Sequence, residues 1–493
     1  MTEEKLIFEI SKPGKSAVSL DECVSDPFGA ECPPALRRAV DLGLPQVSEP
    51  ELIRHYFRLS QKNFSVDTHF YPLGSCTMKY NPKINEELAR LSGFELVHPL
   101  FPTENVQGIL QLMAELEEYL AELTGMHSFT LQPAAGAHGE LTGMMLVKAY
   151  HAARGEAQRV KVIVPDSSHG TNPASAGIYG FEIVEIESNE RGRVTIDALR
   201  NAAAEDCACL MLTNPNTLGL FEDDILEIAD VVHEKGGLLY YDGANMNALM
   251  GLCRPGDMGF DIVHLNLHKT FSTPHGGGGP GAGPVGVCEK LAPFLPVPRI
   301  RKTESGCDFD NDRPESIGKI KSFYGNVGVL VKAYCYIRIM GLEGLRQASR
   351  DAIITANYLR TQIGSFFPIP YNDICMHEFV ASAEMLREVD IHAADIAKRL
   401  LDFGFHAPTV SFPLIVKEAL MIEPTETESK MTLDAFAEAL RVIYQEARDN
   451  PEHVKNAPHS LPINRCDEVK AARNPDLCFH APSCEKENIP VSR

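Results

Sequence analysis

The sequence predicts an α/β protein with a mainly parallel sheet and a second, smaller α+β domain. From about residue 128 onward, short apolar runs alternate with helix-length segments such as 223–235, which a Gly-Gly pair closes. Such alternation is typical of βαβ units. Polar clusters follow several runs directly, at the end of the strand where ligands bind in a parallel sheet. The predicted strands are 160–164, 181–186, 207–212, 237–241, 260–267 and 285–288.

The remaining patterns divide the chain into four predicted parts. A helix is expected over 109–123, because apolar residues recur there at spacings of three and four and Gly125 lies where a C-cap would fall. Another helix is expected over 325–340, with short strands at 376–381 and 410–415 after it. The parts are an extended N-terminal arm (1–100), a large domain (101–335), a small C-terminal α+β domain (336–450) and a C-terminal tail (451–493).

Composition and charge exclude several classes of protein. The chain has 493 residues, 44% of them hydrophobic and 23% charged, which is ordinary for a globular protein. A net charge of −21 disfavours nucleic-acid binding, because so acidic a chain repels phosphate backbones. No apolar run approaches the roughly 18 residues that a membrane span needs. The charged N-terminus shows no secretory signal, so we expect a cytoplasmic protein.

The cysteines support the same location. There are 13 of them, an odd number without a CxxC pair, which predicts reduced thiols rather than a disulfide framework. Cys207 and Cys209 alternate within an apolar run, so we expect both on one face of a strand.

The most informative segment is 264–283, in which a predicted strand ends near Lys269 and a glycine-rich stretch, 275–283, follows. A lysine alone at a strand end would most simply be a solvated edge residue. Glycines, however, let the backbone approach a ligand closely. A lysine beside them, at the carboxyl end of a strand, suits a Schiff base with an aldehyde cofactor.

Three other interpretations of this segment fail. Residues 281–286 match G-x-G-x-x-G, but Pro284 leads into a β-like run, whereas a dinucleotide fingerprint should open a helix. The segment has no G-K-[ST] and so no P-loop. His264 and His268 would lie about 13 Å apart in a strand, at roughly 3.3 Å per residue, too far apart to bind one metal ion. No metal site is expected.

Two further clusters suit pyridoxal phosphate. Asp242 follows the strand 237–241 and, taken alone, would be a turn or helix-cap residue. Beside the cofactor it would pair with the pyridinium nitrogen and keep that nitrogen protonated. The segment 132–140 opens a helix with small residues, and bare N–H groups at a helix start bind phosphate. The candidate phosphate contacts are Ala135, Gly136 and Ala137.

Polar residues after two other strands complete the pattern. His169 could stack on the cofactor ring, although a lone histidine here would more simply belong to a turn. Thr213 and Asn214, in an Asn-Pro turn, could meet the phenolic oxygen of the ring. A phosphate cradle, a histidine, an Asn-Pro turn, an aspartate and a lysine thus follow one another along the chain. That order is the plan of fold-type I pyridoxal-phosphate enzymes.

These segments resemble the P-protein family of the glycine cleavage system, the decarboxylating glycine dehydrogenases, and in particular the second subunit of the two-chain form. The resemblance covers about 60–430, and the block around Lys269 is its most specific part. The matching segments are 73–79, 131–140, 168–173, 242–247, 264–283 and 423–429.

The resemblance implies the fold-type I, aspartate-aminotransferase-like fold, with pyridoxal 5'-phosphate as cofactor. It implies decarboxylation of glycine, release of CO2, and transfer of the aminomethyl group to the lipoyl group of the carrier (H) protein. Lys269 would bind the cofactor, Asp242 would keep the pyridine nitrogen protonated, and His169 would stack on the ring. Ala244 and His268 are further expected cofactor contacts. The implied partner is a first subunit without the cofactor lysine, with two copies of each chain in a heterotetramer.

Two of the matching segments keep alternative interpretations. The loop 74–79 could line the entrance for the lipoyl arm, with Cys76 sensitive to oxidation, or it could be an arm loop with a spectator thiol. The segment 423–429 is expected to cap a helix. The alternative functions are another fold-type I enzyme acting on a small amino acid, and a cofactor-free scaffold subunit, which would need neither Lys269 nor Asp242.

Overall fold

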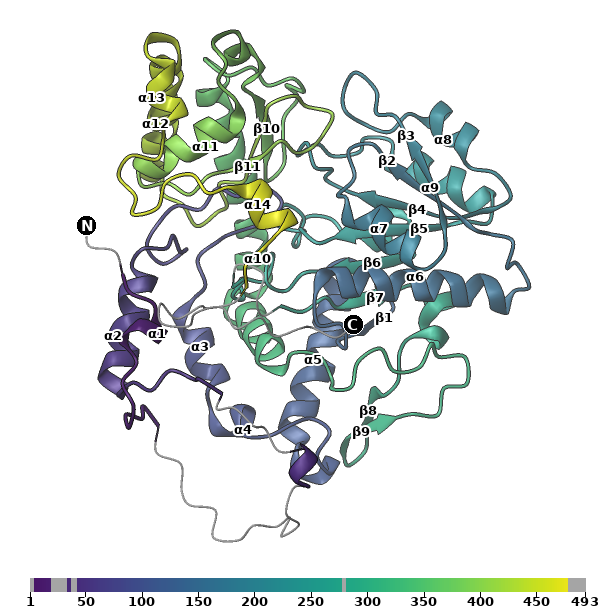
Figure 1. The fold of residues 1–493 in the computed structure, drawn as a ribbon. Coiled ribbons are helices and arrows are strands. Elements are labelled where there is room, and N and C mark those ends of the chain that lie inside the picture. The colour runs from purple at the N-terminus through teal and green to yellow at the C-terminus, as the bar shows by residue number, and fades with distance from the viewer. Residues whose placement is uncertain (1–3, 19–32, 37–41, 277–280, 478–493) are drawn as a thin grey trace. The chain divides into compact units, whose positions relative to one another are not determined.

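A seven-stranded sheet forms the centre of the larger of two units in the computed structural model (Figure 1). The structure describes residues 4–18, 33–36, 42–276 and 281–477. One unit contains residues 65–457, and the other contains residues 1–64 and 458–493. This division does not test the four predicted parts, which stay a prediction.

Among the described residues of the smaller unit, the regular secondary structure consists of short helices. In α2, Glu51 accepts hydrogen bonds from the backbone and the hydroxyl of Ser48, at 2.9 and 2.7 Å, which fixes the start of the helix. The helices are α1 (Ile7–Ile10), a 3-10 turn (Pro34–Leu36), α2 (Glu49–Ser60) and α14 (Glu468–Arg473).

The sheet of the larger unit has the order β1-β7-β6-β5-β4-β2-β3. The pairs from β3 through β6 are parallel, and β7 is antiparallel to both β6 and β1. Each predicted apolar run overlaps one strand, so the prediction of a mainly parallel sheet is confirmed. The strands are β1 (Ser128–Thr130), β2 (Lys161–Pro165), β3 (Glu182–Ile186), β4 (Cys207–Thr213), β5 (Leu238–Gly243), β6 (Ile262–Leu265) and β7 (Val285–Val287).

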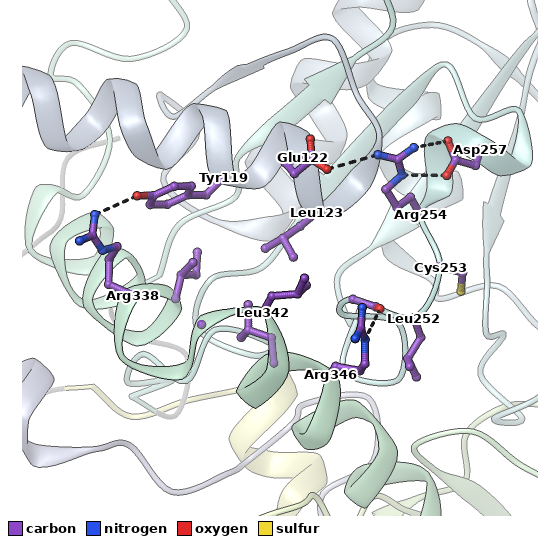
Figure 2. A pocket seen from close by; sticks show the side chains of 14 residues that line it. Tyr119, Glu122, Leu123, Leu252, Cys253, Arg254, Asp257, Arg338, Leu342 and Arg346 are labelled. Atoms are coloured by element: carbon purple, nitrogen blue, oxygen red, sulfur yellow. Dashed lines mark hydrogen bonds and ion pairs between the residues drawn. The ribbon is translucent and has the colours of Figure 1, made fainter.

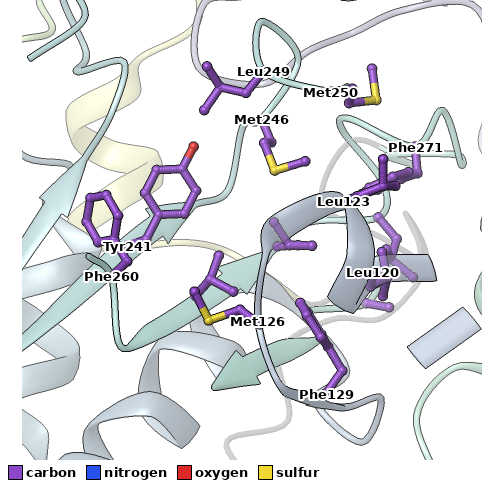
Figure 3. Packing of buried hydrophobic residues seen from close by; sticks show 14 of the residues in the cluster. Leu120, Leu123, Met126, Phe129, Tyr241, Met246, Leu249, Met250, Phe260 and Phe271 are labelled. Atoms are coloured by element: carbon purple, nitrogen blue, oxygen red, sulfur yellow. The ribbon is translucent and has the colours of Figure 1, made fainter. Parts of the chain in front are cut away.

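Helices cover both faces of this sheet because successive strand residues point to opposite sides. Tyr240 packs in the cluster that includes α6 (Gly136–Ala153), whereas Tyr241 packs in the cluster with α5 (Gln107–Thr124), α9 (Ile225–Glu234) and α10 (Val327–Ile363). Figure 3 shows part of the second cluster, where Phe129 of β1 lies near Leu120 and Leu123 of α5. As predicted, Gly125 ends α5 in the left-handed conformation, with a φ of 71°.

One prediction about β4 is wrong. Cys207 and Cys209 belong to the clusters on opposite faces of the sheet. The reason is a bulge: Lys161 of β2 pairs with Cys207, but Val162 pairs with Cys209, so Ala208 is an extra residue. The carbonyl oxygen of Ala208 instead lies 2.9 Å from Nε2 of His151.

A three-stranded antiparallel sheet follows in the chain, with the order β10-β12-β11. Its strands are β10 (Phe379–Ser382), β11 (Thr409–Val410) and β12 (Ala419–Ile422), and α11 (Ala393–Asp402) and α12 (Lys430–Asp449) pack with them in one apolar cluster. The predicted strand 410–415 is thus wrong beyond Val410. Strand β11 ends at Val410 because Ser411 has a φ of 57° and Pro413 has no N–H to donate.

The other elements of this unit are short. They are α3 (Lys83–Ala89), α4 (Ser92–Glu95), α7 (Thr171–Ile178), α8 (Ile196–Ala202), α13 (Pro451–Lys455), the hairpin strands β8 (Arg299–Thr303) and β9 (Gly306–Asp310), and 3-10 helices at Thr103–Asn105, Pro255–Met258, Glu289–Phe294 and Glu384–Val389. No helix in the described part of the chain has the length and apolar character needed to cross a membrane.

The parallel strands place the polar residues together. In the register of the sheet, Thr213 of β4 pairs with Asp242 of β5, and Asp242 pairs with His264 of β6. The three carboxyl ends therefore meet at one edge, which is where α/β sheets bind ligands.

Candidate active site

A cavity of about 470 Å³ lies at this edge of the sheet, a size typical of small-molecule sites. Ala135 and Asn214 are not among the described residues that line it. The other eight predicted site residues do line it: Gly136, Ala137, His169, Thr213, Asp242, Ala244, His268 and Lys269.

Lys269 follows β6 and presents its amine to the cavity. Its Nζ donates a hydrogen bond to the carbonyl oxygen of Ser75 at 2.6 Å. His268 lines the cavity beside it, and burial, with the nearby charges of His275 and Lys269, lowers its pKa to about 3. Its ring is therefore neutral at pH 7. Part of the glycine-rich stretch, 277–280, lies outside the described residues.

Asp242 is a buried carboxylate surrounded by donors. Its Oδ2 accepts hydrogen bonds from Asn172 Nδ2 at 3.0 Å and from Thr213 Oγ1 at 3.4 Å, and its Oδ1 accepts one from the N–H of Ala244 at 3.0 Å. Nε2 of His264 lies 3.3 Å from Oδ1. Burial alone would raise the pKa of Asp242, but His264 and these donors lower it. The site therefore holds a fixed negative charge.

A second buried acid, Glu140 of α6, lies near the same ring nitrogen of His264. Nε2 of His264 lies 3.9 Å from Glu140 Oε1 and has no hydrogen bond in the described structure. Glu140 accepts hydrogen bonds from the hydroxyls of Thr171 and Ser175, at 2.9 and 3.0 Å. His169 lies 2.8 Å from the same Thr171 hydroxyl through its Nδ1. The sequence analysis did not single out Glu140 or Asn172, although both lie within matching segments, 131–140 and 168–173.

The start of α6, where the sequence predicts a phosphate cradle, lies at the cavity. Its first N–H groups have no partner within the helix, and the positive end of the helix dipole faces the cavity there. A Cβ at Gly136 would overlap the carboxamide of Asn266, so any larger residue there would require Asn266 to move. Oδ1 of Asn266 is buried and has no hydrogen-bond partner among the described residues. The carbonyl oxygen of Ala135, outside the lining, accepts the N–H of Gly139 at 2.9 Å.

Asn214 has a structural position instead. Its Oδ1 accepts the N–H of Glu222 at 3.0 Å, and the residue is fully buried. From the same turn, Thr213 and Thr217 reach the cavity. The pattern of residues predicts the turn but not which of its side chains faces a ligand.

The loop 74–79 meets the segment 423–429 at the cavity. Ser75 and Cys76 line it, and the N–H of Ser75 donates to Glu378 Oε2 at 2.7 Å. Thr77 donates to Glu423 twice, from its N–H at 3.0 Å and from its hydroxyl at 2.7 Å. Both carboxylates flank strands of the small sheet: Glu378 directly precedes β10, and Glu423 directly follows β12. Ser429 caps α12, which confirms the predicted helix cap.

Sequence reasoning missed His377 and Glu378, which also line the cavity. A single His-Glu pair before an apolar run gives no signal of a site. Glu423 did lie in a matching segment, but nothing in the sequence shows that its side chain turns inward.

A larger cavity, of about 590 Å³, lies between α5, the segment 251–257 and α10 (Figure 2). Its arginines already have partners: Arg254 pairs with Asp257, Arg346 donates to the carbonyl of Gly251, and Arg338 donates to the Tyr119 hydroxyl. It contains none of the predicted site residues. We therefore place the chemistry in the smaller cavity.

Solved structures show the same fold. A glycine decarboxylase (P-protein) of the glycine cleavage system, in inhibitor-bound form, matches with a TM-score of 0.71 over 84% of this chain and 94% of its own, at 21% identity. The glutamate decarboxylase of Lactobacillus brevis matches with a TM-score of 0.64 over 86% of this chain and 98% of its own, at 13% identity. The predicted fold-type I architecture is confirmed.

Sequence comparison is more specific. Residues 18–301 match the glycine cleavage system P-protein family, and residues 348–462 match the glycine dehydrogenase C-terminal domain. The probable glycine dehydrogenase (decarboxylating) subunit 2 of Caldanaerobacter subterraneus is 59% identical over 95% of this chain and 97% of its own length. The protein of the same name from Exiguobacterium sibiricum is 59% identical over 97% of this chain and 98% of its own. The chain therefore belongs to the glycine cleavage system P-protein family, in the branch whose members are named glycine dehydrogenase (decarboxylating) subunit 2.

Proposed function

We propose that this chain binds pyridoxal phosphate at Lys269, decarboxylates glycine with release of CO2, and transfers the aminomethyl group to the lipoyl group of the carrier (H) protein. The observation that carries the proposal is the placement of Lys269 and Asp242 on one cavity, beside the start of α6. The names of the relatives, glycine dehydrogenase (decarboxylating) subunit 2, support the choice of glycine as substrate.

The residues present fit the cofactor. The start of α6, with Gly136 and Ala137, suits its phosphate, and the unpartnered oxygen of Asn266 marks a polar position beside that cradle. Asp242 suits its ring nitrogen, and the amine of Lys269 suits its aldehyde. When bound, pyridoxal phosphate withdraws electrons from the bond to the departing carboxylate.

The protein's own groups have separate tasks in this proposal. Asp242 supplies a fixed negative charge, which its donors and His264 hold in place. His169 covers one face of the ring position, and Thr213 contacts the cavity from β4. Lys269 delivers its amine and later helps to release the product. His268, whose pKa is about 3, contacts the ligand as a neutral ring.

The partners follow from the same proposal. The name subunit 2 implies a first subunit, and we propose two copies of each chain. This chain is acidic, with a net charge of −21, so an acidic lipoyl carrier would have to dock on a local basic patch or on the first subunit. We propose the cytoplasm as its location, in keeping with the nine cysteines that are free in the described part of the chain.

An absorbance spectrum of the purified chain with pyridoxal phosphate, before and after borohydride, tests cofactor binding. We expect a visible-edge band that reduction removes, with the label on the Lys269 peptide. Lys269→Ala should abolish label and band, and the control Lys302→Ala, an exposed lysine paired with Glu118, should change neither. A colourless chain, tested also with its first subunit, would favour the scaffold alternative.

Exchange of labelled bicarbonate into glycine tests the reaction. We expect exchange by the complex of this chain with its first subunit and the carrier, and none with Lys269→Ala. Bound cofactor without exchange would contradict glycine decarboxylation and favour another fold-type I enzyme, because aminotransferases do not fix CO2 into glycine.

A further inference from the structure

Two buried carboxyl groups lie side by side at the cavity, and the tasks assigned above use neither. Glu378 is 3% exposed and Glu423 is fully buried. One carboxyl oxygen of each, together with a ring nitrogen of His377, lie within 4.8 Å of one another. Both ring nitrogens of His377 lack a hydrogen-bond partner among the described residues. The three residues lie at the same end of the strand pair β10–β12, where Phe379 pairs with Ile422.

The donors around the pair are unequally divided. Glu423 accepts three, the N–H and hydroxyl of Thr77 and the carboxamide of Asn245 at 2.8 Å. Glu378 accepts one, the N–H of Ser75. Hydrogen bonds from donors favour the ionised form of a carboxyl group. The negative charge of the pair therefore belongs on Glu423, and the proton on Glu378.

The surroundings keep one proton on the pair at neutral pH. Burial raises the pKa of both groups, that of Glu423 to about 7, and the neighbouring charge of Glu423 raises that of Glu378 further. Two adjacent carboxylates in a buried site do not both ionise readily. His377 adds no positive charge, since burial lowers its pKa to about 3, and the thiol of Cys76 is held neutral by burial. Lys269 is the positive group that faces the pair, and it disfavours a metal ion there.

Ser75 connects this pair to the catalytic lysine. Its carbonyl oxygen accepts the hydrogen bond from Lys269, while its own N–H donates to Glu378. Glu378 also lines the cavity, whereas Glu423 lies behind it. A proton on Glu378 is therefore at the wall of the site where the substrate would react.

The proposed reaction needs such a proton. The Cα–carboxylate bond of glycine breaks and leaves its electron pair on carbon, which forms a C–S bond with one lipoyl sulfur. The S–S bond then breaks, its electron pair stays on the second sulfur, and that sulfur must take a proton to become a thiol. Carbon is thereby oxidised and the disulfide reduced. One proton is released at the ammonium group of glycine, so protons balance over a turnover.

We propose that Glu378 is the acid that protonates the second lipoyl sulfur, and that Glu423 is a positioning residue that keeps Glu378 protonated. The pair regains its proton from the ammonium group of glycine. This inference rests on the proposed function and adds a catalytic residue to it.

Infrared spectroscopy of the purified full-length chain in D2O tests the protonation without any turnover. In the difference spectrum between the wild type and Glu378→Gln at pH 7, where other buried acids such as Glu222 cancel, we expect a band from one protonated carboxyl group. In Glu423→Gln the same band should titrate away at lower pH, because the negative neighbour is gone. The exposed control Glu384→Gln should leave the band and its titration unchanged. A band absent at pH 7, or insensitive to Glu378→Gln, overturns the proposal.

Kinetics of the complex test the role in transfer. With oxidised lipoylated carrier as acceptor, Glu378→Gln should slow the appearance of the carrier thiol by about 10²–10⁴-fold, the usual contribution of a general acid. Cofactor absorbance should be unchanged, and Glu378→Asp should restore part of the rate. In Glu423→Gln the alkaline limb of the pH profile should move to lower pH.

The outcomes separate the two proposals. Normal rates in Glu378→Gln, with an active wild-type enzyme, overturn the role of Glu378 alone. A wild-type complex that forms no aminomethyl carrier overturns the proposed function together with the acid role.

Discussion

Lys79 and Glu426 form a buried ion pair, in which Nζ lies 2.8 Å from Oε1 and the lysine side chain is only 1% exposed. Nζ also donates to Asn247 at 2.8 Å and lies over the ring of Tyr336. The pair joins the loop 74–79 to the segment after β12. Burial alone would lower the pKa of Lys79, but Glu426 and Tyr336 raise it.

Removal of this lysine should destabilise the chain. Lys79→Ala leaves Glu426 without its positive partner, which typically costs about 3–5 kcal/mol. We expect a lower thermal unfolding midpoint and a lower urea midpoint for the cofactor-free chain. Lys83→Ala is the matched control, because Lys83 is half exposed and pairs with Asp67 at the surface, a kind of pair worth ~1 kcal/mol or less. Equal midpoints for both variants would contradict a stabilising role of the buried pair.

Asp242→Asn should lower turnover far more than cofactor binding. The amide keeps the size of the side chain but carries no charge to hold a proton on the ring nitrogen. A fall in kcat of about 10²–10³-fold is typical when one preorganised electrostatic partner is lost. Cofactor content by absorbance and kcat by CO2 release measure the two effects, with exposed Asp223→Asn as the control. Unchanged turnover would remove the role assigned to Asp242.

Cys76 should react slowly with alkylating reagents at neutral pH. Burial raises the pKa of its thiol, and the opposing charge of Lys269 does not cancel that effect. Because the thiolate is the reactive form, labelling by iodoacetamide should accelerate as the pH rises above 9. Peptide mapping by mass spectrometry compares it with exposed Cys466 in the same sample. Fast labelling of Cys76 at pH 7 would favour the redox-sensitive interpretation, and normal rate and oxidant sensitivity in Cys76→Ser would leave a spectator thiol.

Glu222 should make the fold less stable at alkaline pH. Burial raises its pKa from 4.5 to about 7. A carboxyl group whose pKa is higher in the folded state stabilises the fold fully below pH 4.5, and this contribution is lost as the pH rises through 7. The loss corresponds to roughly 3 kcal/mol, at 1.36 kcal/mol for each pKa unit.

Unfolding by urea at pH 5 and pH 8 measures this effect. In Glu222→Gln, the decrease in stability between the two pH values should be smaller than in the wild type. Glu227→Gln, at a half-exposed position on α9, should behave as the wild type does. An identical pH dependence in all three proteins would show that Glu222 is not the group responsible.

The local pattern of apolar and turn residues predicted the sheet well, because most strands from β2 to β7 are short apolar runs. It failed where one residue changes the register, as Ala208 does in β4, or where an irregular φ stops a strand, as at Ser411. It also predicted only the first part of α10. That helix runs from Val327 to Ile363 across Gly341, which has a φ of 59° within it.

The site was predictable for residues that follow strands or open a helix. Lys269 and Asp242 stand at strand ends, where topology alone brings them to one edge. Glu378 lines the cavity and Glu423 lies behind it, and their contacts are with Ser75 and Thr77, more than 300 positions away in the chain. Neither the hydrophobic periodicity nor the spacing of motifs in the sequence can predict a contact over that separation.

Because of these distant contacts, the wall of the cavity that includes the loop 74–79 can be completed only late in translation. The loop leaves the ribosome early, but its partners Glu378, Glu423 and Glu426 are added 303, 346 and 347 residues after Ser75, Thr77 and Lys79. Until then, the strands that hold Lys269 and Asp242 can form without one wall of their pocket. A nascent chain that stops after β7 and before Glu378 would carry the lysine and the aspartate but not the acids opposite them.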